Sequence, residues 1–241
     1  MMKTHRIPTI CLTALLTAAA LALFVPGRPA EASGEEGPPA ARSEYKGRRI
    51  AQTMSFHGAP WLIRPERDRE ENTKLLIEAL QVKEGQTIAD IGCGNGFYTL
   101  QLAELVGPNG RVLAVDIQPE MLTMLDERAS EAGIENIEPI LGAPADPKLP
   151  TGAVDVVLLV DVYHEFSYPE RMLAAMRASL KPKGRIALAE YRMEDPSVPI
   201  KLLHKMSKKQ ILKEYRANGL TLVHEFDELP WQHLMFFGRA D

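Results

Sequence analysis

The sequence is poor in cysteine and has no excess of basic residues. Its 241 residues include two cysteines, and 28 lysines and arginines stand against 32 aspartates and glutamates, a formal net charge of −4. Proteins that bind nucleic acid usually carry a basic surface, so we expect no nucleic-acid partner. Cys11 lies in an N-terminal apolar run. If that run is removed, Cys93 has no partner and the mature chain cannot form an intrachain disulfide.

Charged residues are absent from positions 9–25, which follow a basic start at Lys3 and Arg6. Pro26-Gly27 ends the apolar run, and Ala30-Glu31-Ala32 offers a small-x-small cleavage site. This pattern predicts that residues 1–32 are a secretory signal peptide and that the mature protein is exported to the periplasm or the extracellular space. The alternative is that residues 9–25 remain as a membrane anchor, which would be the only membrane contact.

The rest of the chain divides into three parts. Residues 33–43 are rich in Gly, Pro, Ala and Glu, which predicts a disordered linker. Residues 44–74 are predicted to form a cap of short helices and loops, with one short helix over 48–54. Residues 75–241 are predicted to form a single domain.

That domain shows an alternation of apolar runs and helical patterns. A run at 154–160 is almost wholly apolar, as in a central parallel strand. The last two runs, 220–226 and 234–237, are joined by a loop too short for a crossover helix, so they should pair antiparallel. We expect a doubly wound α/β fold whose sheet is mostly parallel. The other expected strands are 87–91, 111–116, 137–141 and 185–190.

The first of these strands runs into the stretch Asp90-Ile91-Gly92-Cys93-Gly94-Asn95-Gly96. A third glycine of a dinucleotide motif would have to stand at Phe97, so that motif is missing. The stretch instead resembles motif I of the class I S-adenosylmethionine (SAM)-dependent methyltransferases, of the single-domain type that acts on small molecules. That family has a seven-stranded sheet with its last strand reversed, as the terminal hairpin here predicts. The resemblance implies SAM as the cofactor.

The resemblance also implies which residues bind the cofactor. Asp116 ends the second strand, where the family's acid binds both ribose hydroxyls, and Asp90 would help to fix the methionine moiety. The adenine contact is open between Asp146, displaced from the family's position, and backbone groups near Ala143. The full set of predicted cofactor-binding residues is Asp90, Gly92, Gly94, Asn95, Gly96, Asp116, Ile117, Asp146 and Asp161.

The candidate catalytic residues Tyr163, His164 and Glu165 follow the fourth strand. His164 could take a proton from the acceptor, Glu165 could do so instead, or His164 could only orient the loop. No ligand spacing supports a metal site, so none is predicted. Other side chains are candidates for the wall of a substrate pocket: His57, Trp61, Tyr191, His204, Trp231 and His233.

These observations favour an enzyme that transfers a methyl group from SAM to a small-molecule acceptor by direct displacement. The sequence does not indicate the oligomeric state of this enzyme. One alternative is a protein that binds SAM without catalysis. Another is a nicotinamide-dependent oxidoreductase, which Phe97 and the terminal hairpin disfavour.

Overall fold

The computed structural model describes Met2 and residues 40–240. The predicted signal peptide, the alternative anchor and most of the predicted linker therefore lie outside the described residues. Within the described part of the chain, no helix has the length and apolar character needed to cross a membrane.

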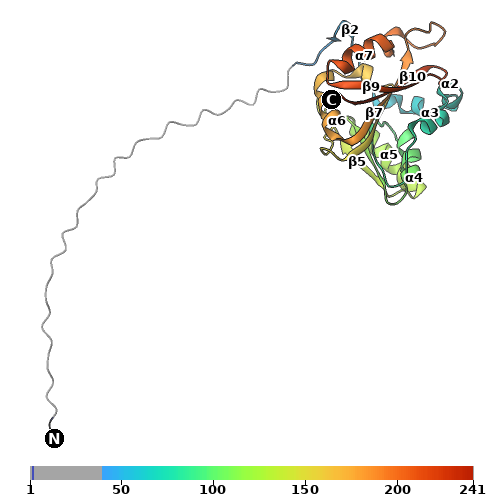
Figure 1. Cartoon of the computed structure of the whole chain (residues 1–241). Coiled ribbons are helices and arrows are strands. Elements are labelled where there is room, and N and C mark those ends of the chain that lie inside the picture. Colours follow the sequence, from blue (N-terminus) through green and yellow to red (C-terminus); the bar gives the residue numbers. More distant parts are fainter. Residues whose placement is uncertain (1, 3–39, 241) are drawn as a thin grey trace, which may run out of the picture. The chain divides into compact units, whose positions relative to one another are not determined.

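A sheet of eight strands forms the centre of the domain (Figure 1). Five neighbouring strands are parallel, and β10 runs antiparallel to both of its neighbours. This confirms the predicted fold class and the terminal antiparallel pair. A two-residue strand, β8 (Lys205–Met206), adds to the expected seven by pairing with β7. The order is β5 (Ile137–Leu141), β4 (Arg111–Asp116), β3 (Thr87–Ile91), β6 (Val154–Val160), β7 (Leu180–Arg192), β10 (Gln232–Arg239) and β9 (Leu220–Phe226).

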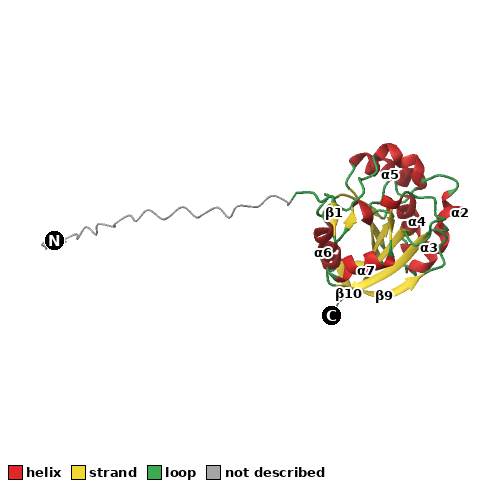
Figure 2. Cartoon of the chain, turned by 90° about the horizontal axis from the view of Figure 1, so that it is seen from above, coloured by secondary structure: helices red, strands yellow, loops and turns green. Residues whose placement is uncertain are grey.

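Helices cover both faces of the sheet (Figure 2). On one face lie α3 (Thr73–Leu80), α4 (Phe97–Val106) and α5 (Pro119–Ala132); on the other lie α6 (Pro169–Ser179) and α7 (Lys208–Arg216). Alternate residues of β6 enter the two cores: Val156 and Leu158 pack with α3 and α4, and Val157 and Leu159 pack with α6 and α7. Burial on both faces explains why this strand is apolar at every position except Asp155.

Residues 48–54 do not form the predicted helix. Instead β1 (Glu44–Tyr45) and β2 (Arg48–Arg49) make a small hairpin. Its two turn residues, Lys46 and Gly47, have φ values of 48° and 87°, and a two-residue hairpin turn with both φ angles positive matches the twist of its strands. Three short helices complete the N-terminal cap, which we define as residues 44–74 and which includes the first residues of α3: η1 (Phe56–Gly58), α1 (Ala59–Leu62) and α2 (Arg67–Glu71).

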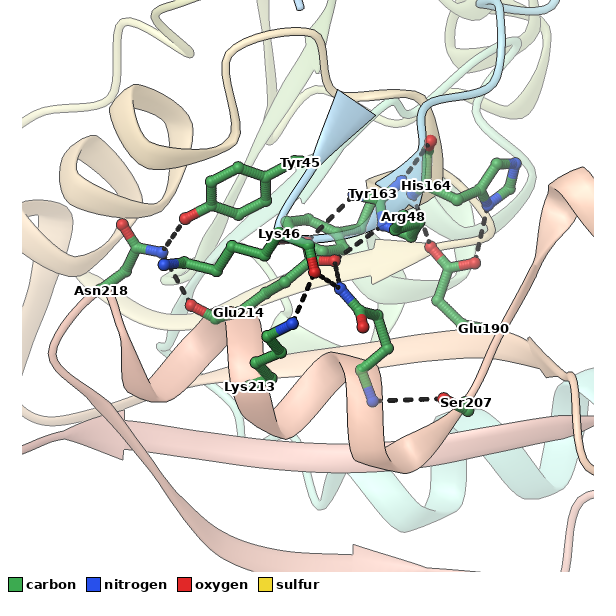
Figure 3. A network of polar contacts seen from close by, with 11 residues as sticks. Tyr45, Lys46, Arg48, Tyr163, His164, Glu190, Ser207, Lys213, Glu214 and Asn218 are labelled. Carbon is green, nitrogen blue, oxygen red and sulfur yellow. Dashed lines mark hydrogen bonds and ion pairs between the residues drawn. The ribbon is translucent and has the colours of Figure 1, made fainter. Parts of the chain in front are cut away.

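Arg48 fastens this cap to the domain (Figure 3). Its guanidinium donates to both carboxylate oxygens of Glu214 in α7, at 2.8 and 3.0 Å, and to the backbone carbonyl of His164 at 2.9 Å. Both ionic side chains are buried. A buried pair of this kind is costly to break, because the remaining charge has no partner. The hairpin is therefore held against the loop that follows β6.

Candidate active site

A cavity of about 530 Å³ opens at the carboxyl ends of the central strands. Ile91, Asp116 and Val160 bring the ends of β3, β4 and β6 to it, Leu62 belongs to the cap, and Ile200 lies on the segment after β7. In open α/β sheets, ligands bind at this edge, where the strand order reverses. Here the reversal occurs at β3, which lies between β4 and β6.

The glycine loop borders the cavity with bare backbone. Gly92, Gly94 and Gly96 have φ values of 69°, 54° and 84°, which side-chain-bearing residues rarely adopt. A Cβ atom on Gly94 would also lie 2.5 Å from Leu62 Cδ1. The helix α4 begins directly after the loop, so its free N–H groups lie at this edge of the sheet.

Asp116 joins the end of β4 to the glycine loop. Its Oδ2 accepts from the backbone N–H of Gly94 at 3.0 Å, and its Oδ1 accepts from the N–H of Gln118 at 2.9 Å. Burial raises the pKa of Asp116, although these backbone hydrogen bonds oppose the shift. Asp116 and the neighbouring Ile117 both line the cavity.

Two residues of the motif support the loop from behind and do not line the cavity. Asp90 is buried and accepts a hydrogen bond from the hydroxyl of Thr99 at 2.6 Å. Burial raises the pKa of Asp90 to about 6. Asn95 donates from Nδ2 to the carbonyl of Ala59 at 3.2 Å and so ties the loop to α1.

Asp161 presents a carboxylate at the end of β6. It lines the cavity with a φ of 51°. Its Oδ2 accepts from Gln232 at 2.7 Å, whereas its buried Oδ1 has no hydrogen-bond partner among the described residues. Burial, with the charge of Glu71, raises the pKa of Asp161. Glu71 is itself fully buried and accepts from Arg64, Arg67 and Tyr191.

His164 lies on η2 (Tyr163–Glu165), directly after β6. Its backbone N–H donates to Glu190 Oε1 at 3.1 Å, and its Nδ1 lies 2.7 Å from Glu190 Oε2 (Figure 3). Its Nε2 lies 3.1 Å from Nδ1 of His204. Burial lowers the pKa of His164. The charge of Glu190 and its hydrogen bond raise this pKa by a larger amount, so the net shift is upward.

The neighbours of His164 in η2 point in different directions. Glu165 lines the cavity, and its Oε1 accepts from the backbone N–H of Met54 at 3.2 Å. Burial raises the pKa of Glu165 to about 7, against the opposing charge of His164. Tyr163 is fully buried outside the cavity and donates to Glu214 at 2.7 Å.

Residues 82–234 match the family model described as a methyltransferase domain. The chain belongs to this methyltransferase family. Its mostly parallel sheet with antiparallel C-terminal strands matches the class I methyltransferase fold, the fold that the resemblance of the glycine motif implied.

Relatives of this methyltransferase match about half of the chain. Nocamycin O-methyltransferase of Saccharothrix syringae is 34% identical over 113 residues, which are 47% of this chain and 40% of that protein. Demethylmenaquinone methyltransferase of Listeria monocytogenes is 28% identical over 131 residues, 54% of this chain and 53% of that protein. The chain thus spans about half the length of these relatives or less. The crystal structure of a SAM-dependent methyltransferase from Aquifex aeolicus shares the fold, with a TM-score of 0.72 at 23% identity over 77% of this chain and 98% of that one.

Seven of the predicted site residues of this methyltransferase meet at the cavity, and the other five lie outside its lining. Asp146 is among the latter, and its Oδ1 accepts from the backbone N–H of Lys148 at 2.8 Å. Ala143 and Pro144 line the cavity where the adenine contact was left open. The residues at the cavity are Gly92, Gly94, Asp116, Ile117, Asp161, His164 and Glu165; those outside are Asp90, Asn95, Gly96, Asp146 and Tyr163.

Several side chains of the methyltransferase site are not recognisable from the sequence pattern. Gln118 holds the cap by accepting from Phe56 N at 2.8 Å and donating to Met54 O at 3.0 Å. Arg67 and Glu71 lie in a run of charged residues at 66–71, yet both are buried and line the cavity. Of the aromatic and histidine candidates for the wall, Trp61, Tyr191 and His204 line the cavity, and His57, Trp231 and His233 do not.

Proposed function

We propose that this methyltransferase moves a methyl group from SAM to a small-molecule acceptor. The observation that carries the proposal is a single cavity that joins the glycine loop and Asp116 to the side chains of His164 and Glu165. Its volume of about 530 Å³ falls within the range of small-molecule sites. The names of the two relatives, an O-methyltransferase and a demethylmenaquinone methyltransferase, agree with a small acceptor.

The residues at one end of the cavity fit SAM. Asp116 offers carboxylate lone pairs to two ribose hydroxyls, and Gly94 presents backbone without a side chain at the cavity wall. The unpartnered Oδ1 of Asp161 is suited to accept from the ammonium of the methionine moiety, which would satisfy a buried oxygen. Ala143 would lie against the adenine.

When bound, SAM supplies a methyl group on a positively charged sulfur, ready for direct displacement. The protein's share is alignment, because a nucleophile held in line behind the methyl carbon reacts as if at very high concentration. His164, Glu165 and His204 form the polar end of the cavity. There they can orient the acceptor. When they bind no metal ion, their lone pairs can also take up the proton that the acceptor loses.

Transfer of label from methyl-labelled SAM to a pool of small metabolites tests this function. We expect labelled products with the wild-type chain and much less product with Asp116→Ala at the same SAM concentration. If calorimetry shows that SAM binds but no pool accepts label, the chain is a SAM-binding protein without catalysis. If it binds a nicotinamide cofactor in preference to SAM, the proposal is wrong.

We further propose that the enzyme is exported, on the N-terminal pattern of a basic start, an apolar run and a small-x-small site. Sequencing the mature N-terminus should give a start at or near Ser33. Intact chain in washed membranes would favour an anchor, and intact chain in the cytoplasmic fraction would contradict export.

A further inference from the structure

Three metal-ligating side chains converge at the polar end of the cavity. Nε2 of His164, Nδ1 of His204 and a carboxylate oxygen of Glu165 all lie within 4.8 Å of one another. The two ring nitrogens are 3.1 Å apart, and His164 Nε2 is 4.0 Å from Glu165 Oε1. Two nitrogens bound to one tetrahedral zinc ion at about 2.0–2.1 Å are about 3.3 Å apart. The imidazoles are therefore close to the spacing that one ion requires.

Glu190 supports His164 as a metal ligand. This buried carboxylate lies 2.7 Å from His164 Nδ1 and also accepts the backbone N–H of the same residue. A carboxylate only accepts, so Nδ1 carries the proton and the lone pair of neutral His164 is on Nε2, toward His204. Histidines that bind metals usually have such a carboxylate behind them, because it fixes the tautomer and the ring orientation.

The local charge also favours a cation. Among residues 40–240, neither Glu165 nor Glu190 has a lysine or arginine within ion-pair distance, and His164 is the partner of both. The nearby guanidinium of Arg48 is already bound to Glu214. Two carboxylates at a largely buried site would thus be compensated by a divalent ion.

We propose that His164, His204 and Glu165 bind a Zn²⁺ ion at the acceptor end of the cavity. Two imidazoles and one carboxylate are a ligand set of catalytic zinc sites, which keep a further position open. That position would face the cavity, because all three residues line it. For the role of the ion, this inference rests on the proposed function: an acceptor oxygen or sulfur bound to zinc loses its proton more easily. The three side chains would then act as ligands and not as direct proton acceptors.

Titration of the chelator-treated full chain with Co²⁺, a coloured substitute for Zn²⁺, tests the site. We expect one ion per chain, visible absorption typical of low-coordinate Co²⁺, and loss of that absorption when Zn²⁺ is added. His204→Ala and Glu165→Gln should each weaken binding at least about 10-fold, and Glu190→Gln about 10- to 100-fold. His204 is only partly buried on η3 (Leu202–His204), so its variant should fold.

The matched control is His233→Gln. His233 also pairs with a carboxylate, Glu194 at 2.8 Å, but lies outside the cavity, so this variant should bind Co²⁺ as the wild type does. Absence of ion binding, or binding that His204→Ala leaves unchanged, would overturn the proposal. SAM affinity is measured on the same metal-free chain. If the ion binds but SAM does not, the metal site stands and the proposed function fails.

Discussion

Replacing Asp90 with asparagine should stabilise the ligand-free protein at neutral pH. The Asp90 carboxyl is buried at the end of β3, and burial raises its pKa from the ordinary 3.8 to about 6. The native state therefore holds a proton on Asp90 that the unfolded state releases between about pH 4 and pH 6. Across this window the free energy of unfolding falls as pH rises, and at pH 7 the full cost of the buried charge is present.

The size of that cost follows from the difference between 3.8 and about 6, which corresponds to about 3 kcal/mol at pH 7. The introduced asparagine would be neutral and nearly the same shape, and its side-chain oxygen can still accept from Thr99. We expect Asp90→Asn to raise the free energy of unfolding by up to about 3 kcal/mol at pH 7 and by less than about 1 kcal/mol at pH 4.

Urea unfolding at pH 4, 5, 6 and 7 measures both free energies. Asp146→Asn, at an exposed carboxyl, is the control and should change the free energy of unfolding at pH 7 by less than about 0.5 kcal/mol. A loss of stability in Asp90→Asn at pH 7, or an equal gain at pH 4 and pH 7, would refute the reasoning.

Three other changes probe the cavity and the cap. Asp116→Ala should weaken SAM binding by about 2 kcal/mol or more in calorimetry, because two ribose hydroxyls lose a charged acceptor. Unchanged affinity would contradict the role of Asp116, at the end of β4, in binding the ribose. Gly94→Val should abolish SAM binding, because a branched side chain would occupy the place where the ligand must lie against the backbone. Gly133 also has a positive φ, but a Cβ atom there would have open space around it. Gly133→Ala should therefore cost about 1 kcal/mol of stability and leave the SAM affinity unchanged. Arg48→Ala should lower the free energy of unfolding by about 3–5 kcal/mol, because Glu214 would keep a buried charge without a partner; a loss under about 1 kcal/mol would show that water reaches Glu214.

The sheet and one end of the site could be predicted because their signals are local. The apolar run Val154–Val160 identified the central strand, since β6 is buried on both faces. The short connection before the last strand required an antiparallel pair. The glycine loop follows β3 and Asp116 ends β4, and these neighbouring parallel strands bring their carboxyl ends to one edge. Short local sequence patterns were therefore enough to predict the cofactor end of the cavity.

The acceptor end could not be predicted because it depends on contacts between distant segments. His204 meets His164 across 40 residues of sequence, and no ligand spacing connects them. Arg48 and Glu214 are 166 residues apart. The helical periodicity at 48–54 was overridden by the Lys46–Gly47 turn, whose positive φ angles favour a hairpin.

These distant contacts make the N-terminal cap part of the active site, although the methyltransferase family model matches only residues 82–234. The backbone N–H of Met54 donates to Glu165, Gln118 at the N-cap of α5 bonds to the cap twice, and Arg48 donates to the carbonyl of His164. A chain that began at Leu75 would keep the glycine loop and Asp116. It would lose the Met54 N–H that opposes the raised pKa of Glu165, and Glu214 would lose its arginine partner. Order in the cap and geometry at the acceptor end are therefore thermodynamically coupled, since the same hydrogen bonds contribute to both.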